Sequence, residues 1–178
     1  VPDDEGIEEK PLQSSEQESN NEQLENDASG EVPLNADALS LKAANTVQNG
    51  IYLLTPAANS GLNFGVSSSA LAATTAPRND ALTFSFNAEG IASIQDNAGN
   101  YLTAQGSSLI FSAQSSELNQ QWQFLDSGNG SYVIRNVATQ TVLDVKSGNI
   151  ANGTKVQLYQ ANGTAAQNWN LYEVGSTI

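Results

Sequence analysis

The stretch that decides the fold is TKVQLYQANGTAAQNWNLY, residues 154–172. It reads as a strand, a turn region with Asn-Gly, and a second strand. Within it, Trp169 stands two residues after Gln167, and the same Gln-x-Trp spacing occurs once more, at Gln120 and Trp122. The chain has no other tryptophan. One frame that recurs at both tryptophans indicates an internal repeat.

From Asn49 onward the sequence consists of short apolar stretches that Gly, Asn and Ser residues interrupt. Asn-Gly dipeptides, which are typical of tight turns, occur at 129–130, 152–153 and 162–163. Twelve such stretches at regular spacing predict an all-β barrel or sandwich.

Three copies of one pattern follow when the sequence is aligned on its tryptophans. YVIRNVATQTVLDV parallels ASIQDNAGNYLTAQ, and a weaker first copy carries Phe84 where the others have Trp. The repeats run over about 49–88, 89–127 and 128–173, with four strands in each. A copy of this size cannot close a core alone, so we expect three-fold pseudo-symmetry around a shared core of Phe84, Trp122 and Trp169.

The last repeat carries the most specific pattern. VLDVKSGNIANGTKVQLYQANGTAAQNW, residues 142–169, contains Leu-Asp-Val, Asn-Gly-Thr, Val-Gln-Leu-aromatic and Gln-x-Trp in that order. This string resembles the ricin B-type lectin domain, and the resemblance extends over roughly 49–173. It implies an all-β fold, a β-trefoil with three pseudo-symmetric four-strand repeats, and carbohydrate binding.

Asp144 and Tyr159 are the best candidates for a sugar site because they provide the two groups that sugar recognition needs. A carboxylate accepts hydrogen bonds from hydroxyls, and an aromatic face covers the C–H bonds of the ring. The resemblance implies that Asp144 binds two vicinal hydroxyls, that Tyr159 stacks on the sugar, and that Gln157 lines the same pocket. Gln167 completes this set, with a mainly structural role beside Trp169, and Ala166 stands where the family often has Asn.

Two readings stay open for the main pair of residues. Asp144 is alternatively a strand-end carboxylate that caps backbone amides, and Tyr159 a half-buried strand aromatic. The second repeat offers a weaker site at Phe111, Asn119 and Gln120, because Thr103 replaces the carboxylate.

The first 42 residues differ from the rest in composition. They carry twelve acids and two lysines, a charge of −10 within the −13 of the whole chain, and they contain no aromatic residue. Such a segment cannot bury enough apolar area to offset its ordering entropy. We therefore expect a disordered acidic linker over 1–42, followed by the folded domain over 43–178.

The absence of two residue types excludes several functions. The chain has no Cys and no His, so it lacks thiolate zinc sites and Ser-His or Cys-His nucleophile pairs. The carboxylates of the folded part show no paired spacing, so we expect no enzyme, no metal and no cofactor. Few basic residues argue against nucleic acid, and no apolar run is long enough to span a membrane.

These observations predict a secreted or cell-surface tethered module that binds galactose-, lactose- or xylose-type glycans. The alternative is a degenerate β-trefoil that serves as a protein-interaction or spacer module without sugar binding. The chain starts at Val1, which fits either a spacer left after processing or a boundary inside a longer protein.

Overall fold

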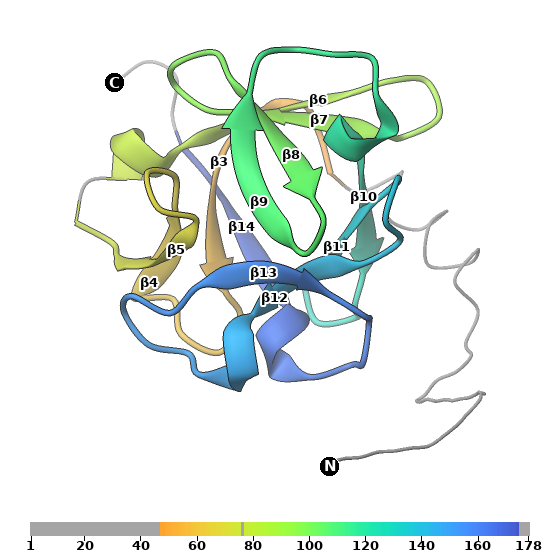
Figure 1. The fold of residues 1–178 in the computed structure, drawn as a ribbon. Helices are drawn as coiled ribbons and strands as arrows, with labels where there is room; N and C mark the ends of the chain where they lie inside the picture. The colour runs from red at the N-terminus through yellow and green to blue at the C-terminus, as the bar shows by residue number, and fades with distance from the viewer. Residues whose placement is uncertain (1–46, 76, 175–178) are drawn as a thin grey trace. The chain divides into compact units, whose positions relative to one another are not determined.

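The computed structural model describes residues 47–75 and 77–174, so the predicted acidic linker lies outside the described residues. The described chain forms strands and short 3₁₀-helices (Figure 1). The strands are β3 (Gly50–Pro56), β4 (Leu62–Gly65), β5 (Ala70–Ala73), β6 (Leu82–Phe86), β7 (Ala92–Gln95), β8 (Tyr101–Gln105), β9 (Ser108–Ser112), β10 (Trp122–Asp126), β11 (Tyr132–Asn136), β12 (Val142–Val145), β13 (Val156–Tyr159) and β14 (Trp169–Glu173). The 3₁₀-helices are η2 (Pro77–Asp80), η3 (Leu118–Gln120), η4 (Lys146–Gly148) and η5 (Ala165–Gln167). Within the described ranges no helix combines the length and apolarity that crossing a membrane requires.

Six of these strands close a barrel. They are the first and last strand of each quartet, and each pairs antiparallel with its two neighbours in the order β3, β6, β7, β10, β11, β14 and back to β3. Closure leaves no unpaired sheet edge in the barrel.

The six remaining strands form three hairpins, β4–β5, β8–β9 and β12–β13. Figure 1 shows them at the left, top and bottom of one common centre. Three quartets of this kind are a β-trefoil, so the predicted fold class is confirmed. Glycines with positive φ turn the chain in two Asn-Gly loops, at Gly130 (φ 79°) and Gly153 (φ 90°), as the turn pattern predicted.

The shared core contains the residues that the repeat pattern predicted. Phe84, Trp122 and Trp169 are all 0% exposed. Phe84 stacks on Tyr52 with ring centroids 4.7 Å apart and contacts Phe124 at 4.8 Å. Aromatic pairs at these separations add to the stabilisation from buried area alone.

The register nevertheless corrects one detail of the first repeat. Trp122 pairs with the first strand of its own repeat at Ala92, and Trp169 does so at Tyr132. In the first repeat the residue at that position is Leu82, which pairs with Tyr52. Leu82 therefore occupies the tryptophan position, and the alignment of Phe84 with the tryptophans is wrong by two residues.

Phe84 corresponds instead to Phe124, since both residues lie two positions after the start of the last strand of their repeat. A shift of two residues keeps a side chain on the same face of a strand. Phe84 is therefore still a core residue despite the misalignment.

Each tryptophan also ties its barrel strand to its hairpin. The indole Nε1 of Trp122 donates to the backbone O of Leu102 at 3.1 Å, and that of Trp169 donates to Leu143 O at 3.2 Å. A buried indole N–H needs such a partner. The bond fixes the hairpin strand at the residue just before Thr103 in one repeat and Asp144 in the other.

We predict that Trp122→Ala lowers the free energy of unfolding by about 3–5 kcal/mol, because it leaves a cavity and an unpaired carbonyl. Tyr172→Ala is the control, since Tyr172 is an exposed aromatic on β14, and it should cost less than about 1 kcal/mol. Urea denaturation followed by circular dichroism measures both. Equal losses in the two variants would contradict the shared-core assignment.

Candidate functional site

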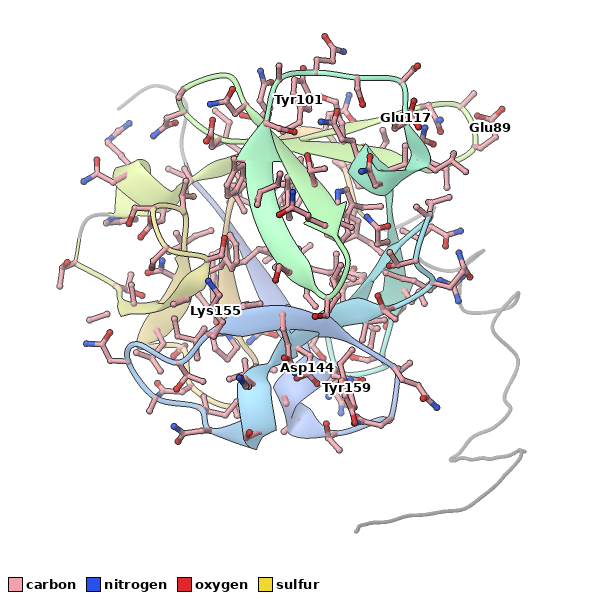
Figure 2. All side chains as sticks on the ribbon, viewed as in Figure 1. Glu89, Tyr101, Glu117, Asp144, Lys155 and Tyr159 are labelled. Carbon is pink, nitrogen blue, oxygen red and sulfur yellow. The ribbon has the colours of Figure 1, made fainter. Side chains whose placement is uncertain are left out.

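The outer face of the β12–β13 hairpin brings the predicted sugar-site residues together. Asp144 lies opposite Gln157, and Val142 lies opposite Tyr159. Residues two apart on a strand share a face, so Asp144 and Tyr159 are diagonal neighbours, with Cα atoms about 7–8 Å apart. Figure 2 shows both labelled side chains next to each other beside β13. The hairpin therefore places Asp144 and Tyr159 on one face.

Two glutamine amides hold the Asp144 carboxylate. Gln157 Nε2 donates to Asp144 Oδ1 at 3.1 Å, and Gln167 Nε2 donates to Asp144 Oδ2 at 2.9 Å. The carboxylate is 5% exposed, so it forms the floor of the site rather than a projecting group. One amide per oxygen leaves each oxygen a lone pair for a further donor.

Gln167 acts on the carboxylate from inside the protein. It is 1% exposed, and its Nε2 also donates to the backbone O of Gln160 at 2.9 Å. Of the residues predicted for sugar contact, Gln167 is therefore a positioning residue, which agrees with the structural role expected beside Trp169. Gln157 is half-buried at the side of the carboxylate.

Tyr159 provides an open aromatic surface. Its side chain is 54% exposed at the end of β13, although aromatic side chains in this fold are mostly buried or half-buried. An exposed ring beside a held carboxylate matches the two requirements of sugar recognition, a hydroxyl acceptor and a face for C–H bonds.

Burial raises the pKa of Asp144 above its ordinary value, while the hydrogen bonds from Gln167 and Gln157 lower it by a smaller amount. The net effect on the pKa is upward, because removing a carboxylate from water penalises the charged form more than two neutral amides stabilise it. Lowering the pH therefore neutralises this carboxyl before an ordinary aspartate.

The second repeat does not reproduce this arrangement. Thr103 lies opposite Ile110, so the residue at the place of Tyr159 is Ser112, opposite Tyr101. Phe111 lies opposite Leu102 on the other face, where its ring contacts Phe64 with centroids 6.3 Å apart. The alignment of Phe111 with Tyr159 is wrong by one residue, and a slip of one residue turns a side chain to the opposite face.

The other two residues predicted for the second site are engaged inside the protein. Gln120 Nε2 donates to Thr103 Oγ1 at 3.0 Å and to Ser112 Oγ at 3.1 Å. These two hydroxyls also bond each other at 2.8 Å. Asn119 Nδ2 donates to Ala104 O at 3.2 Å, and its Oδ1 is buried. Neither amide points to an open surface.

The first repeat is closed in a similar way. Asn63 stands in the place of Asp144, and it accepts a hydrogen bond from Thr74 Oγ1 at 2.8 Å. Its Nδ2 donates to Asp80 Oδ2 at 2.9 Å. Thr74 occupies the place of Tyr159, because it lies two residues after Ala72, the partner of Asn63. Within the described residues, the third repeat alone combines a carboxylate and an aromatic ring at these two places.

A simple count would have found the second-repeat position. Tyr159 lies ten residues before Trp169, and Ser112 lies ten residues before Trp122. Phe111, the aromatic predicted for the second site, lies one residue before Ser112. Because side chains alternate along a strand, it points to the opposite face. In the first repeat the same interval, from Thr74 to Leu82, is eight residues, so no fixed count works there.

The groups that converge at the third repeat can donate and accept hydrogen bonds and cover an apolar face. Across 47–75 and 77–174, no group of three or more His, Cys, Asp or Glu residues lies together as a metal site would require. The groups that converge at the third repeat are one carboxylate, two amides and one phenol ring.

Comparison with known proteins extends this description. The family described as ricin-type beta-trefoil lectin domain-like matches residues 118–178, which include Asp144, Tyr159 and Gln167. No curated protein matches the sequence.

Several solved structures share the fold. A mosquitocidal holotoxin aligns with a TM-score of 0.68 at 18% identity, over 74% of this chain and 18% of that chain. ThreeFoil, a designed 3-fold symmetric protein, aligns with a TM-score of 0.65 at 22% identity, over 70% and 99% of the two chains. The Polyporus squamosus lectin bound to the human-type influenza-binding epitope Neu5Acα2-6Galβ1-4GlcNAc aligns with a TM-score of 0.59 at 18% identity, over 72% and 50%. The described chain is thus a β-trefoil, and the match over residues 118–178 confirms its resemblance to the ricin B-type lectin family.

Proposed function

We propose that this domain is a non-catalytic carbohydrate-binding module that acts outside the cell and binds galactose-, lactose- or xylose-type sugars through its third repeat. The observation that carries the proposal is the outer face of β12–β13. There a carboxylate held by two amides lies beside a tyrosine that is 54% exposed.

The geometry suggests how a sugar binds. Each oxygen of Asp144 already accepts one amide hydrogen bond and has a lone pair left, so the carboxylate can accept from two neighbouring hydroxyls. Tyr159 then covers the apolar face of the ring. One shallow site of this kind gives a binding free energy of about 4–5 kcal/mol, a submillimolar dissociation constant.

The family match supports this reading because it spans all four residues predicted for the site. The Polyporus squamosus lectin, a structural neighbour, is bound to a glycan that contains galactose. At 18% identity it supports the fold, so the sugar class rests on the chemistry of Asp144 and Tyr159.

One observation favours a second candidate function, a protein-interaction or spacer module. In two of the three repeats, a small hydroxyl residue bonds the central side chain and occupies the place that Tyr159 takes in the third repeat. If the third repeat served the same purely structural role, Asp144 would matter for stability and not for binding.

We predict that Asp144→Asn and Tyr159→Ala each weaken lactose binding at least tenfold, because the first replaces one acceptor oxygen and the charge by an NH₂ donor and the second removes the stacking ring. Tyr159→Phe should retain binding, since the ring face remains. Tyr172→Ala is the matched control for loss of an exposed tyrosine. Chemical shifts of the 143–160 amides during a lactose titration measure all four.

The same variants separate the two candidate functions. Unchanged shifts in the unmodified protein across a panel of glycans would reject the lectin function. If Asp144→Asn then lowered the free energy of unfolding by about 1–3 kcal/mol, the spacer module would be the better description.

We also predict a pH dependence of binding that comes from Asp144. Its raised pKa means that the carboxylate loses its charge at a higher pH than an ordinary aspartate. Lactose affinity should therefore fall as the pH drops through this value, by about tenfold for each unit below it. The residual affinity of Asp144→Asn should lack this step, and an identical pH profile in both proteins would contradict the assignment.

The free energy of unfolding should depend on the pH through the same carboxyl, but in the opposite direction from lactose affinity. The folded state binds the Asp144 proton more tightly than the unfolded state, because the pKa is raised on folding. The contribution of Asp144 to the free energy of unfolding is therefore fully present below the unfolded pKa and is lost as the pH rises through the folded pKa. The difference between the unmodified protein and Asp144→Asn, measured by denaturation at several pH values, isolates this term from the other acids.

A further inference from the structure

Two lysines face each other at the end of the hairpin that carries the proposed sugar site. The backbone N of Lys146 donates to Lys155 O at 3.0 Å, which continues the β12–β13 ladder one step beyond Val145 and Val156. Both lysines are exposed. Like charges directly opposite each other on neighbouring strands repel, so this pair stabilises the hairpin less than a neutral pair would.

The charge of the rest of the domain makes this pair unusual. The described residues carry seven acids and four bases, so the pair accounts for half of the bases. Neither lysine forms an ion pair with any residue of 47–75 or 77–174. Lys155 Nζ donates to the backbone O of Ser68 at 3.3 Å, which leaves its charge without a neutralising carboxylate.

Both lysines are among the residues that line one hollow of about 420 Å³ in the loop between β12 and β13. The other lining residues are small or polar, and they are Ser147, Asn149, Asn152, Gly153 and Thr154. Two exposed lysines beside hydroxyl and amide residues form an environment that favours an anion.

This hollow adjoins the proposed sugar site. Lys146 lies two residues after Asp144 and begins η4, and Lys155 lies two residues before Gln157, so the hollow is one step beyond Val145 and Val156 at the loop end of the same hairpin. In the view of Figure 2, Lys155 lies towards one end of β13 and Tyr159 towards the other, with Asp144 between them. A substituent of a sugar bound at Asp144 therefore lies within reach of the hollow.

We propose that the hollow between Lys146 and Lys155 binds the carboxylate or sulfate group of an acidic glycan whose neighbouring ring is held by Asp144 and Tyr159. The inference rests on the proposed function, and it adds the class of ligand. Local cations are needed for such a ligand because the chain as a whole carries a formal charge of −13. At physiological salt, charges further away than about 8 Å are largely screened, so Lys146, Lys155 and the nearby Asp144 determine the local charge at the contact.

Titration of the full chain with three matched sugars at low salt tests this. Galactose, galacturonic acid and a galactose sulfate distinguish no anion, a carboxylate and a sulfate ester. We expect at least one acidic sugar to bind more tightly than galactose. Lys146→Gln and Lys155→Gln should each reduce that preference roughly two- to fivefold, the range of an exposed ion pair. Arg78→Gln is the control, since it removes one exposed positive charge outside the hollow.

The outcomes separate this inference from the proposed function. If all three sugars bind equally, or if Arg78→Gln reduces the preference as much as the lysine variants, the lysine hollow is overturned while sugar binding stands. If no sugar binds, the proposed sugar recognition is wrong. A titration with inorganic sulfate then tests whether the hollow binds an anion in the absence of a sugar. Shifts of the 146–155 amides that Lys146→Gln abolishes would uphold an anion site there, and unchanged shifts would overturn it.

Discussion

Two hydrogen bonds from one short segment determine how the third repeat is built. The indole of Trp169 holds the backbone of Leu143, and the amide of Gln167 holds the side chain of Asp144. Successive residues of β12 are thus fixed in different ways, one through its carbonyl and the next through its carboxylate. The Gln-x-Trp frame is therefore structural, and its structural role is to hold the buried Asp144 carboxylate in position on the hairpin. Support of this kind, one layer behind a contact group, sets how accurately that group is positioned.

The three repeats satisfy the same position with different chemistry. In the second, Gln120 donates to the hydroxyl of Thr103. In the first, donor and acceptor are exchanged, because Asn63 donates to Asp80. One position is that of Asp144 on the hairpin, and the other is that of Gln167, two residues before the tryptophan position. A donor at one and an acceptor at the other satisfy both side chains, whichever position holds the donor. Of the three, the third repeat alone puts a charged acceptor on the hairpin, and it does so beside Tyr159, the most exposed aromatic of the described residues.

The features that sequence could predict are those set by periodicity and by residue type. The Gln-x-Trp repeat predicted three-fold pseudo-symmetry and the buried Trp122 and Trp169, and the resemblance of residues 142–169 to the ricin B-type lectin domain implied the trefoil and the roles of Asp144 and Tyr159. The predictions that were wrong, the alignments of Phe84 and Phe111, depended on the register of the strands. Loops of unequal length moved the tryptophan position of the first repeat to Leu82, and a slip of one residue assigned Phe111 to the wrong face. The lysine pair was missed because ladder pairing, which sequence does not show, brings residues nine positions apart opposite each other.

The closure of two repeats has a consequence for valency. Thr74 and Ser112 fill, with short hydroxyl side chains, the places that an aromatic ring takes in the third repeat. If the third repeat binds a sugar as proposed, the described repeats offer one open position, and one copy would engage one branch of a polysaccharide at a time. Bridging of two branches would require several copies in one assembly, whose spacing would then set the avidity.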